Sequence, residues 1–192
     1  MNDFIKYNDL EICALMLSEN TEIRKQAFDV IYDRYASVVY TFCLRFLQDK
    51  ESAKDILQET FIKFFDYIQV KKDPIENIGG FLLKIARNEC INSRPRKKIT
   101  KVDYNNIEIE YNDNTYEQKQ NREILLRALD SLPAKYRELL ILKEFLNYTY
   151  NEIADITDQS RNNVGIMIHR AKQMLKEIVL KINKITKIEI EE

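Results

Sequence analysis

Residues 148–176 read YTYNEIADITDQSRNNVGIMIHRAKQMLK, a pattern typical of two helices joined by a tight turn. Thr149 and Glu152 have the spacing of a capping box, which predicts a helix that begins at this point. Residues 158–159 interrupt that helix, and Ser160 is suited to cap a second, longer one. A helix-turn-helix of this kind commonly places its second helix in the major groove of DNA.

The second of these helices has one apolar stripe and one polar face. The stripe recurs at steps of four and three, as a buried helix face requires, and consists of Val164, Ile168, Ala171, Leu175 and Ile178. A solvated helix usually mixes charges of both signs, whereas residues 160–176 contain no carboxylate. Amide and basic side chains contact base edges and phosphates. The residues expected to contact DNA are Arg161, Asn162, Asn163, Ile166, His169, Arg170, Lys172 and Gln173.

Metal and catalytic motifs are absent from the sequence. His169 is the only histidine, and the widely spaced Cys13, Cys43 and Cys90 fall in helical patterns, where we expect reduced core residues. A zinc site needs about four such ligands close together, so no metal site is predicted. GxSxG, P-loop, CxxC and HExxH motifs are also missing. We therefore expect no cofactor and no enzymatic activity.

The composition favours an all-α fold. Three glycines and three prolines among 192 residues are few for a sheet with many turns, and helical periodicity dominates the chain. The length allows two small helical domains, each with a compact core. Because the sequence contains neither an apolar run of 18 residues nor a signal-peptide pattern, we expect a cytoplasmic protein that does not insert into a membrane.

Charge is segregated along the chain, although the formal net charge is only −1. Residues 84–101 contain seven Lys or Arg and one acid, whereas residues 102–118 contain five acids and no base. Phosphate contacts supply most of the non-specific affinity for DNA. A chain with this balance should bind DNA poorly alone and depend on a partner to hold it there.

The acidic segment also marks a domain boundary. It lacks a helical apolar period, is rich in Asn and Asp, and follows Pro95, which disfavours continuation of a helix. Its composition fits a flexible tether and a functional acidic strap equally well. We expect a first helical domain at 1–95, a linker at 96–118, a second helical domain at 119–182, and a tail at 183–192 that is either a frayed helix end or a regulatory extension.

Two long helices are predicted at the start of the first domain. The first runs to about Leu47 and buries a stripe formed by Phe28, Ile31, Tyr35, Val38, Phe42 and Phe46. Asp49 caps the second, and its outer side presents acids and an exposed isoleucine. This side is a candidate docking surface for a basic partner, with an ordinary solvated face as the alternative. Its residues are Asp55, Gln58, Glu59 and Ile62.

A third helix, GFLLKIARNECINSR at 80–94, combines basic, amide and aromatic side chains. Such groups suit unstacked bases beside phosphates. The candidates on this helix are Phe81, Lys84, Arg87, Asn88 and Asn92, and the nearby aromatic residues are Phe64, Phe65 and Tyr67. The alternative is a phenylalanine-rich core with a basic rim.

Three further segments extend the pattern across the chain. They are DILQETFIKFF at 55–65, FLLKIARN at 81–88 and LDSLPAKYRELLILKEF at 129–145, followed by the helix-turn-helix. Their order and spacing resemble the extracytoplasmic-function (ECF) sigma factors, two-domain bacterial subunits that direct RNA polymerase to promoters. The resemblance extends from about Leu10 to Ile178. It departs from the family at Phe81, where a Trp is usual, and at Gly165, which lowers helix propensity by about 1 kcal/mol relative to Ala.

The resemblance implies a role for each surface. The face with Asp55 and Glu59 would dock on bacterial core RNA polymerase, and the helix with Asn88 would recognise and melt the −10 promoter element. The helix with Arg161 would read the −35 element as duplex DNA. An anti-sigma protein, often membrane-anchored in this family, is a further implied partner. A stand-alone helix-turn-helix regulator is the alternative, but it would need a basic balance or a dimerisation helix.

Overall fold

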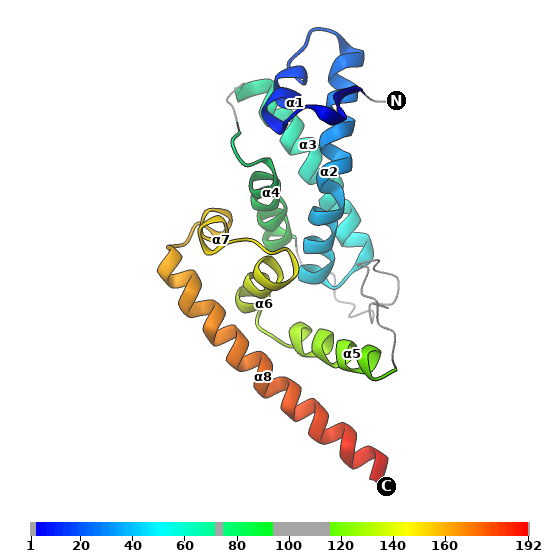
Figure 1. Ribbon diagram of the computed structural model, residues 1–192, viewed down its shortest axis with the longest axis vertical. Helices are drawn as coiled ribbons and strands as arrows, with labels where there is room; N and C mark the ends of the chain where they lie inside the picture. Colours follow the sequence, from blue (N-terminus) through cyan, green and yellow to red (C-terminus); the bar gives the residue numbers. More distant parts are fainter. Residues whose placement is uncertain (1–2, 72–74, 94–115, 192) are drawn as a thin grey trace. The chain divides into compact units, whose positions relative to one another are not determined.

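The computed structural model describes residues 3–71, 75–93 and 116–191, and all regular elements in these ranges are helical (Figure 1). The all-α prediction is therefore confirmed. The chain forms two compact units, which divide near residue 98 and are called here the first and second domains. The expected linker lies largely outside the described residues.

The first domain is built around three long helices. Its elements are the 3-10 helix η1 (Asp3–Lys6), α1 (Asp9–Leu15), α2 (Thr21–Leu47), α3 (Lys50–Lys71) and α4 (Ile78–Asn92). Helices α2, α3 and α4 pack against one another, and α1 packs on α2. The sequence predicted the three long helices but not η1 and α1. The carboxylate of Asp9 accepts hydrogen bonds from Arg34 and Tyr35 of α2, which ties α1 to the domain.

Side-chain caps set the starts of the long helices. The Oδ2 of Asp49 accepts a hydrogen bond from the backbone N–H of Ser52 at 2.8 Å, as predicted for the start of α3. At the start of α4, Oδ1 of Asn77 accepts from the N–H of Gly80, also at 2.8 Å. A Cβ at Gly80 would lie 2.9 Å from Nδ2 of Asn77, so a larger residue there would displace the capping side chain.

The core of the first domain follows the predicted stripe of α2 only in part, because Phe28, Tyr35, Val38 and Phe46 are half-buried. Its fully buried side chains include Ile31, Phe42, Phe64, Leu82 and Leu83. Cys13, Cys43 and Cys90 are buried free thiols, as expected. Burial raises the pKa of Cys13 to about 11, with a further contribution from Asp9. The Cys13 thiol is therefore protonated at neutral pH.

The second domain carries the helix-turn-helix. Its elements are α5 (Tyr116–Asp130), α6 (Ala134–Leu140), the π-helical turn η3 (Ile141–Phe145), α7 (Tyr150–Thr157) and α8 (Arg161–Glu191). Helix α8 packs against α5 and α6. Helix α5 includes the last three residues of the expected linker, and α8 runs as one long helix through residues 183–191 of the expected tail (Figure 1). Within the described residues, none of the helices has the length and apolarity needed to span a membrane.

Candidate nucleic-acid interface

Two caps shape the helix-turn-helix as the sequence predicted. Oγ1 of Thr149 accepts from the N–H of Glu152 at 3.3 Å, and Oε2 of Glu152 accepts from the N–H of Thr149 at 2.8 Å. Oγ1 of Thr149 also donates to Oε2 of Glu152 at 2.7 Å. The backbone N–H of Thr149, followed by this hydroxyl, lowers the pKa of Glu152. Helix α7 ends at Asp158, whose φ of 53° is left-handed. Ser160 then accepts from the N–H of Asn163 at 3.2 Å and starts α8.

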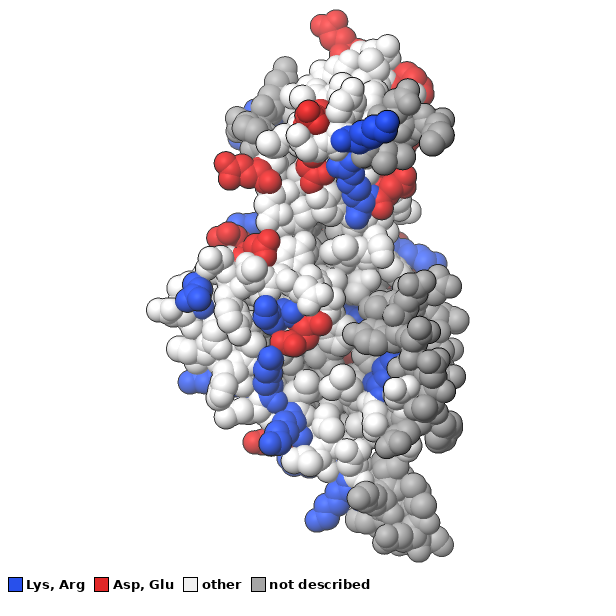
Figure 2. Space-filling view, in the orientation of Figure 1, with Lys and Arg blue, Asp and Glu red and all other residues white. Residues whose placement is uncertain are grey.

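Helix α8 buries the predicted stripe. Val164, Ile168 and Ala171 are at most 1% exposed, while Leu175 and Ile178 are half-buried. All eight proposed DNA contacts are exposed, including Ile166 at 54%. Figure 2 shows Lys and Arg side chains along the course of α8. The rotation of the helix is therefore as predicted, with Asn162, Ile166, His169 and Gln173 opposite the buried face.

Two of the eight side chains have partners within the protein. Nδ2 of Asn163 donates to Oε1 of Gln159 at 2.7 Å, which extends the turn into the helix. Nζ of Lys172 lies 2.8 Å from Oε1 of Glu144 on η3. This pairing was not predicted, because Glu144 is far from Lys172 in the sequence. At Gly165, by contrast, a Cβ would meet no atom within 4 Å, so packing does not require glycine there.

The aromatic residues near α4 are arranged differently from the prediction. Phe81 is half-buried, and its ring centroid lies 4.7 Å from that of Tyr67, also half-buried. Phe64 is fully buried, so it is a core residue and unavailable to a base. Phe65 packs against Phe28 of α2 instead, at 5.7 Å between ring centroids. Phe64 and Phe65 therefore fit the alternative of a phenylalanine-rich core, and Tyr67 and Phe81 form the half-buried aromatic pair beside α4.

The polar side of α4 retains its other candidates. Asn88 and Asn92 are exposed and one helical turn apart, with the exposed Ile91 beside them. Lys84 and Arg87 are half-buried. A row of this kind offers amide donors and acceptors next to cationic groups, which is suitable chemistry for a displaced base and its phosphate.

The candidate docking face lies on the outer side of α3. Asp55, Gln58 and Ile62 are exposed, and the side chain of Glu59 is 46% exposed. Glu59 pairs with Lys63 at 3.3 Å, as its i,i+4 spacing predicted. The face therefore combines carboxylates with an apolar side chain.

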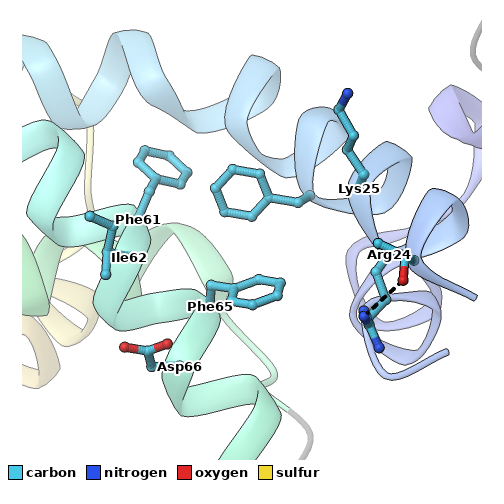
Figure 3. A pocket seen from close by; sticks show the side chains of 8 residues that line it. Arg24, Lys25, Phe61, Ile62, Phe65 and Asp66 are labelled. Atoms are coloured by element: carbon cyan, nitrogen blue, oxygen red, sulfur yellow. Dashed lines mark hydrogen bonds between the residues drawn. The ribbon is translucent and has the colours of Figure 1, made fainter. Parts of the chain in front are cut away.

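Ile62 also lines an apolar cavity of about 390 Å³ between α2 and α3. Figure 3 shows Phe61, Ile62 and Phe65 of α3 at this cavity, with Arg24, Lys25 and Asp66 at its rim. Phe28 of α2 completes the apolar lining. The periodicity of a single helix does not predict this cavity, because the cavity depends on how two helices pack.

No group of three potential metal ligands among His, Cys, Asp and Glu is present in the described part of the chain.

The comparisons with known proteins match both domains. The family model "Sigma-70 region 2" matches residues 31–99, and "Sigma-70, region 4" matches residues 122–175. The "ECF RNA polymerase sigma factor SigM" of Bacillus subtilis is 31% identical over 154 residues, which cover 78% of this chain and 93% of SigM. The "RNA polymerase sigma factor SigV" of the same organism is 29% identical over 138 residues, or 71% of this chain and 81% of SigV.

Two solved structures share the fold. CnrH, solved in complex with the cytosolic domain of CnrY, aligns with a TM-score of 0.64 at 18% identity and covers 89% of this chain and 96% of its own. RpoE from Bartonella quintana, solved with the anti-sigma factor NepR, aligns with a TM-score of 0.58 at 18% identity. That alignment covers 79% of this chain and 96% of RpoE.

Proposed function

Because this chain belongs to the ECF sigma factors of RNA polymerase, we propose that the faces of α3, α4 and α8 divide the work of promoter-specific initiation among them. The observation that carries this assignment is the face of α8, where eight candidate contacts are exposed opposite a buried stripe. Both sigma-70 regions occur on one chain, so a stand-alone helix-turn-helix regulator is not favoured.

Core polymerase docks on the α3 face in this proposal. Asp55 and Glu59 supply negative charge, Gln58 supplies an amide, and Ile62 supplies apolar area. Charged groups at an interface steer association and fix its register, whereas a buried apolar side chain contributes more to affinity. Ile62 is suited to the second role, because it is exposed and also lines the apolar cavity.

The −10 element meets α4. Asn88 and Asn92 would hold the edges of a displaced base, and Lys84 and Arg87 would neutralise phosphates. Phe81 and Tyr67 form a partly exposed aromatic pair from two helices, and such a pair offers a stacking surface that is indifferent to base identity.

The −35 element meets α8 in duplex form. Asn162 and Gln173 are suited to adenine edges, and Ile166 to a thymine methyl group. His169 lies in the same line, whereas Arg161, Arg170 and Lys172 flank it and are better placed for phosphates. Because net charge is only −1, holoenzyme assembly would supply affinity that the free chain lacks.

An anti-sigma protein is the second proposed protein partner. RpoE, which shares this fold, was solved with the anti-sigma factor NepR. CnrH, which also shares it, was solved with the cytosolic domain of CnrY. The site of action would be the cytoplasm, where core polymerase and promoter DNA meet. The chain would contribute recognition and no catalytic group, because bond formation belongs to the polymerase.

Run-off transcription tests the proposed function. Bacterial core polymerase is incubated with genomic fragments, with and without this chain. Initiation at selected sites only in the presence of the chain is expected. Equal transcription in both reactions, or repression by the chain, would contradict the proposal and favour a regulator.

A further inference from the structure

One lysine joins the proposed docking face to the helix proposed to open DNA. Lys63 lies on α3, and its Nζ is 2.6 Å from Oε1 of Glu89 on α4 and 3.3 Å from Oε1 of Glu59 on α3. Glu59 belongs to the docking face, and Glu89 directly follows Asn88 in the sequence. A single side chain therefore connects the two proposed surfaces.

A cation shared by two carboxylates responds to changes at either of them. The hydrogen bond to Glu89 is the main cause that raises the pKa of Lys63, so the ammonium is charged at neutral pH. The side chain of Glu89 is 20% exposed, against 43% for Lys63 and 46% for Glu59. A basic group of a partner therefore reaches Glu59 more readily than Glu89. Once it binds there, it replaces Lys63 at Glu59 and leaves Lys63 to Glu89 alone.

We propose that Lys63 is a positioning residue that couples docking on core polymerase to the placement of α4 on the promoter. The inference rests on the proposed roles of α3 and α4. Docking at Glu59 directs Lys63 to Glu89 and holds α4 against α3. By thermodynamic linkage, placement of α4 raises the affinity for core polymerase by the same factor by which docking favours that placement. Exposed ion pairs are individually weak, so the coupling is severalfold in size and not all-or-none.

A direct phosphate contact by Lys63 would leave a different signature. Such a contact would change the salt dependence of DNA binding by about one counterion. Its loss would also weaken duplex and pre-melted promoters alike. Coupling through α4 affects the opening of duplex DNA and spares a template that is already open.

The test uses the full-length chain with saturating core polymerase on a promoter found by the run-off assay. Lys63→Met and Glu89→Gln are each expected to lower open-complex formation on duplex DNA about three- to fivefold, the upper range for an exposed ion pair. Opening should be unchanged on a template pre-melted at the −10 element. The double variant should lose no more than either single one, because both substitutions remove the same contact. Lys63→Arg should retain opening.

Lys54→Met is the matched control. Lys54 is also on α3 and pairs with Glu51 at 3.5 Å, but at about 100° per residue it lies on the opposite side of the helix from Lys63. This variant should open duplex DNA like the wild type. Additive losses in the Lys63 and Glu89 double variant, or equal losses on duplex and pre-melted templates, would overturn the coupling. A wild-type chain that fails to direct initiation would instead overturn the proposed function.

Discussion

Lys172 of the proposed recognition helix pairs with Glu144 of η3, with 2.8 Å between Nζ and Oε1. The hydrogen bond to Glu144 is the main cause that raises the pKa of Lys172, so its ammonium is charged at neutral pH. The sequence alone groups Lys172 with Arg170 as an exposed cation of α8. The structure separates the two, because the charge of Lys172 is already directed to a carboxylate of its own domain.

Glu144→Gln is expected to release Lys172 for a phosphate contact. Binding of the holoenzyme to all promoters should strengthen, and its salt dependence should steepen by about one counterion. Arg170→Ala should act in the opposite direction. It should weaken binding to all promoters alike and flatten the dependence of binding on salt concentration by about one counterion. Equilibrium binding over a salt series measures both slopes. An unchanged slope in Glu144→Gln would mean that Lys172 does not reach DNA even when released.

The base-reading role of α8 is tested by Gln173→Ala and Ile166→Ala. Both side chains are exposed opposite the buried stripe, so each substitution should relax preference at individual base pairs of the −35 element by about 1 to 3 kcal/mol. A promoter-library selection reads the preference position by position. Arg170→Ala is the control, because loss of a phosphate contact should leave the pattern of preference intact. The reverse outcome would place the DNA on another side of the helix.

Reversal of charge on α3 tests polymerase docking. Asp55→Lys combined with Glu59→Lys should abolish co-purification with core polymerase while the domain stays folded, since exposed substitutions usually change stability by only about 0.5 kcal/mol. Circular dichroism checks the fold. Glu19→Lys combined with Glu76→Lys changes the net charge equally at exposed residues outside α3 and should retain binding. Wild-type recovery of core by the α3 variant would refute the docking surface.

The two asparagines of α4 are expected to act in promoter opening. Replacement of Asn88 and Asn92 by Ala removes the amides that would hold a displaced base edge. Transcription from duplex promoters should fall more than transcription from a template already melted at the −10 element. Ser93→Ala, at the end of the same helix, serves as a comparison for local structural damage, because Ser93 Oγ donates to the carbonyl of Cys90. Equal losses on both templates would argue for capture of single strands or for misfolding.

The capping box of α7 should make the second domain sensitive to acid. The pKa of Glu152 is lowered in the folded chain, chiefly by the backbone N–H of Thr149, so its stabilising effect is present above its ordinary pKa. That effect is lost as the pH falls through the lowered value. At neutral pH the unfolding temperature of Glu152→Gln should therefore be lower than that of the wild type. This difference in unfolding temperature should shrink below about pH 4. A constant difference across this range would exclude the carboxylate as its source.

Local patterns were sufficient for much of this structure. The capping pair Thr149 and Glu152 is three residues apart, and a helix start depends on such near neighbours. The 3.6-residue period likewise determined which side of α8 is buried, because Val164, Ile168 and Ala171 can share a face only in a helix. The prediction of two sigma domains followed from the order of several such segments.

Contacts between helices could not be read from periodicity. Periodicity along α3 indicates which of its sides is buried, but only the packing of α2 on α3 decided that Phe65 meets Phe28. Likewise, the pairing of Lys63 with Glu89 and of Lys172 with Glu144 joins residues distant in sequence. Helix faces are a property of the sequence because neighbours along one helix set them. The partners of exposed charges are a property of the tertiary structure, because only packing brings separate helices within ion-pair distance.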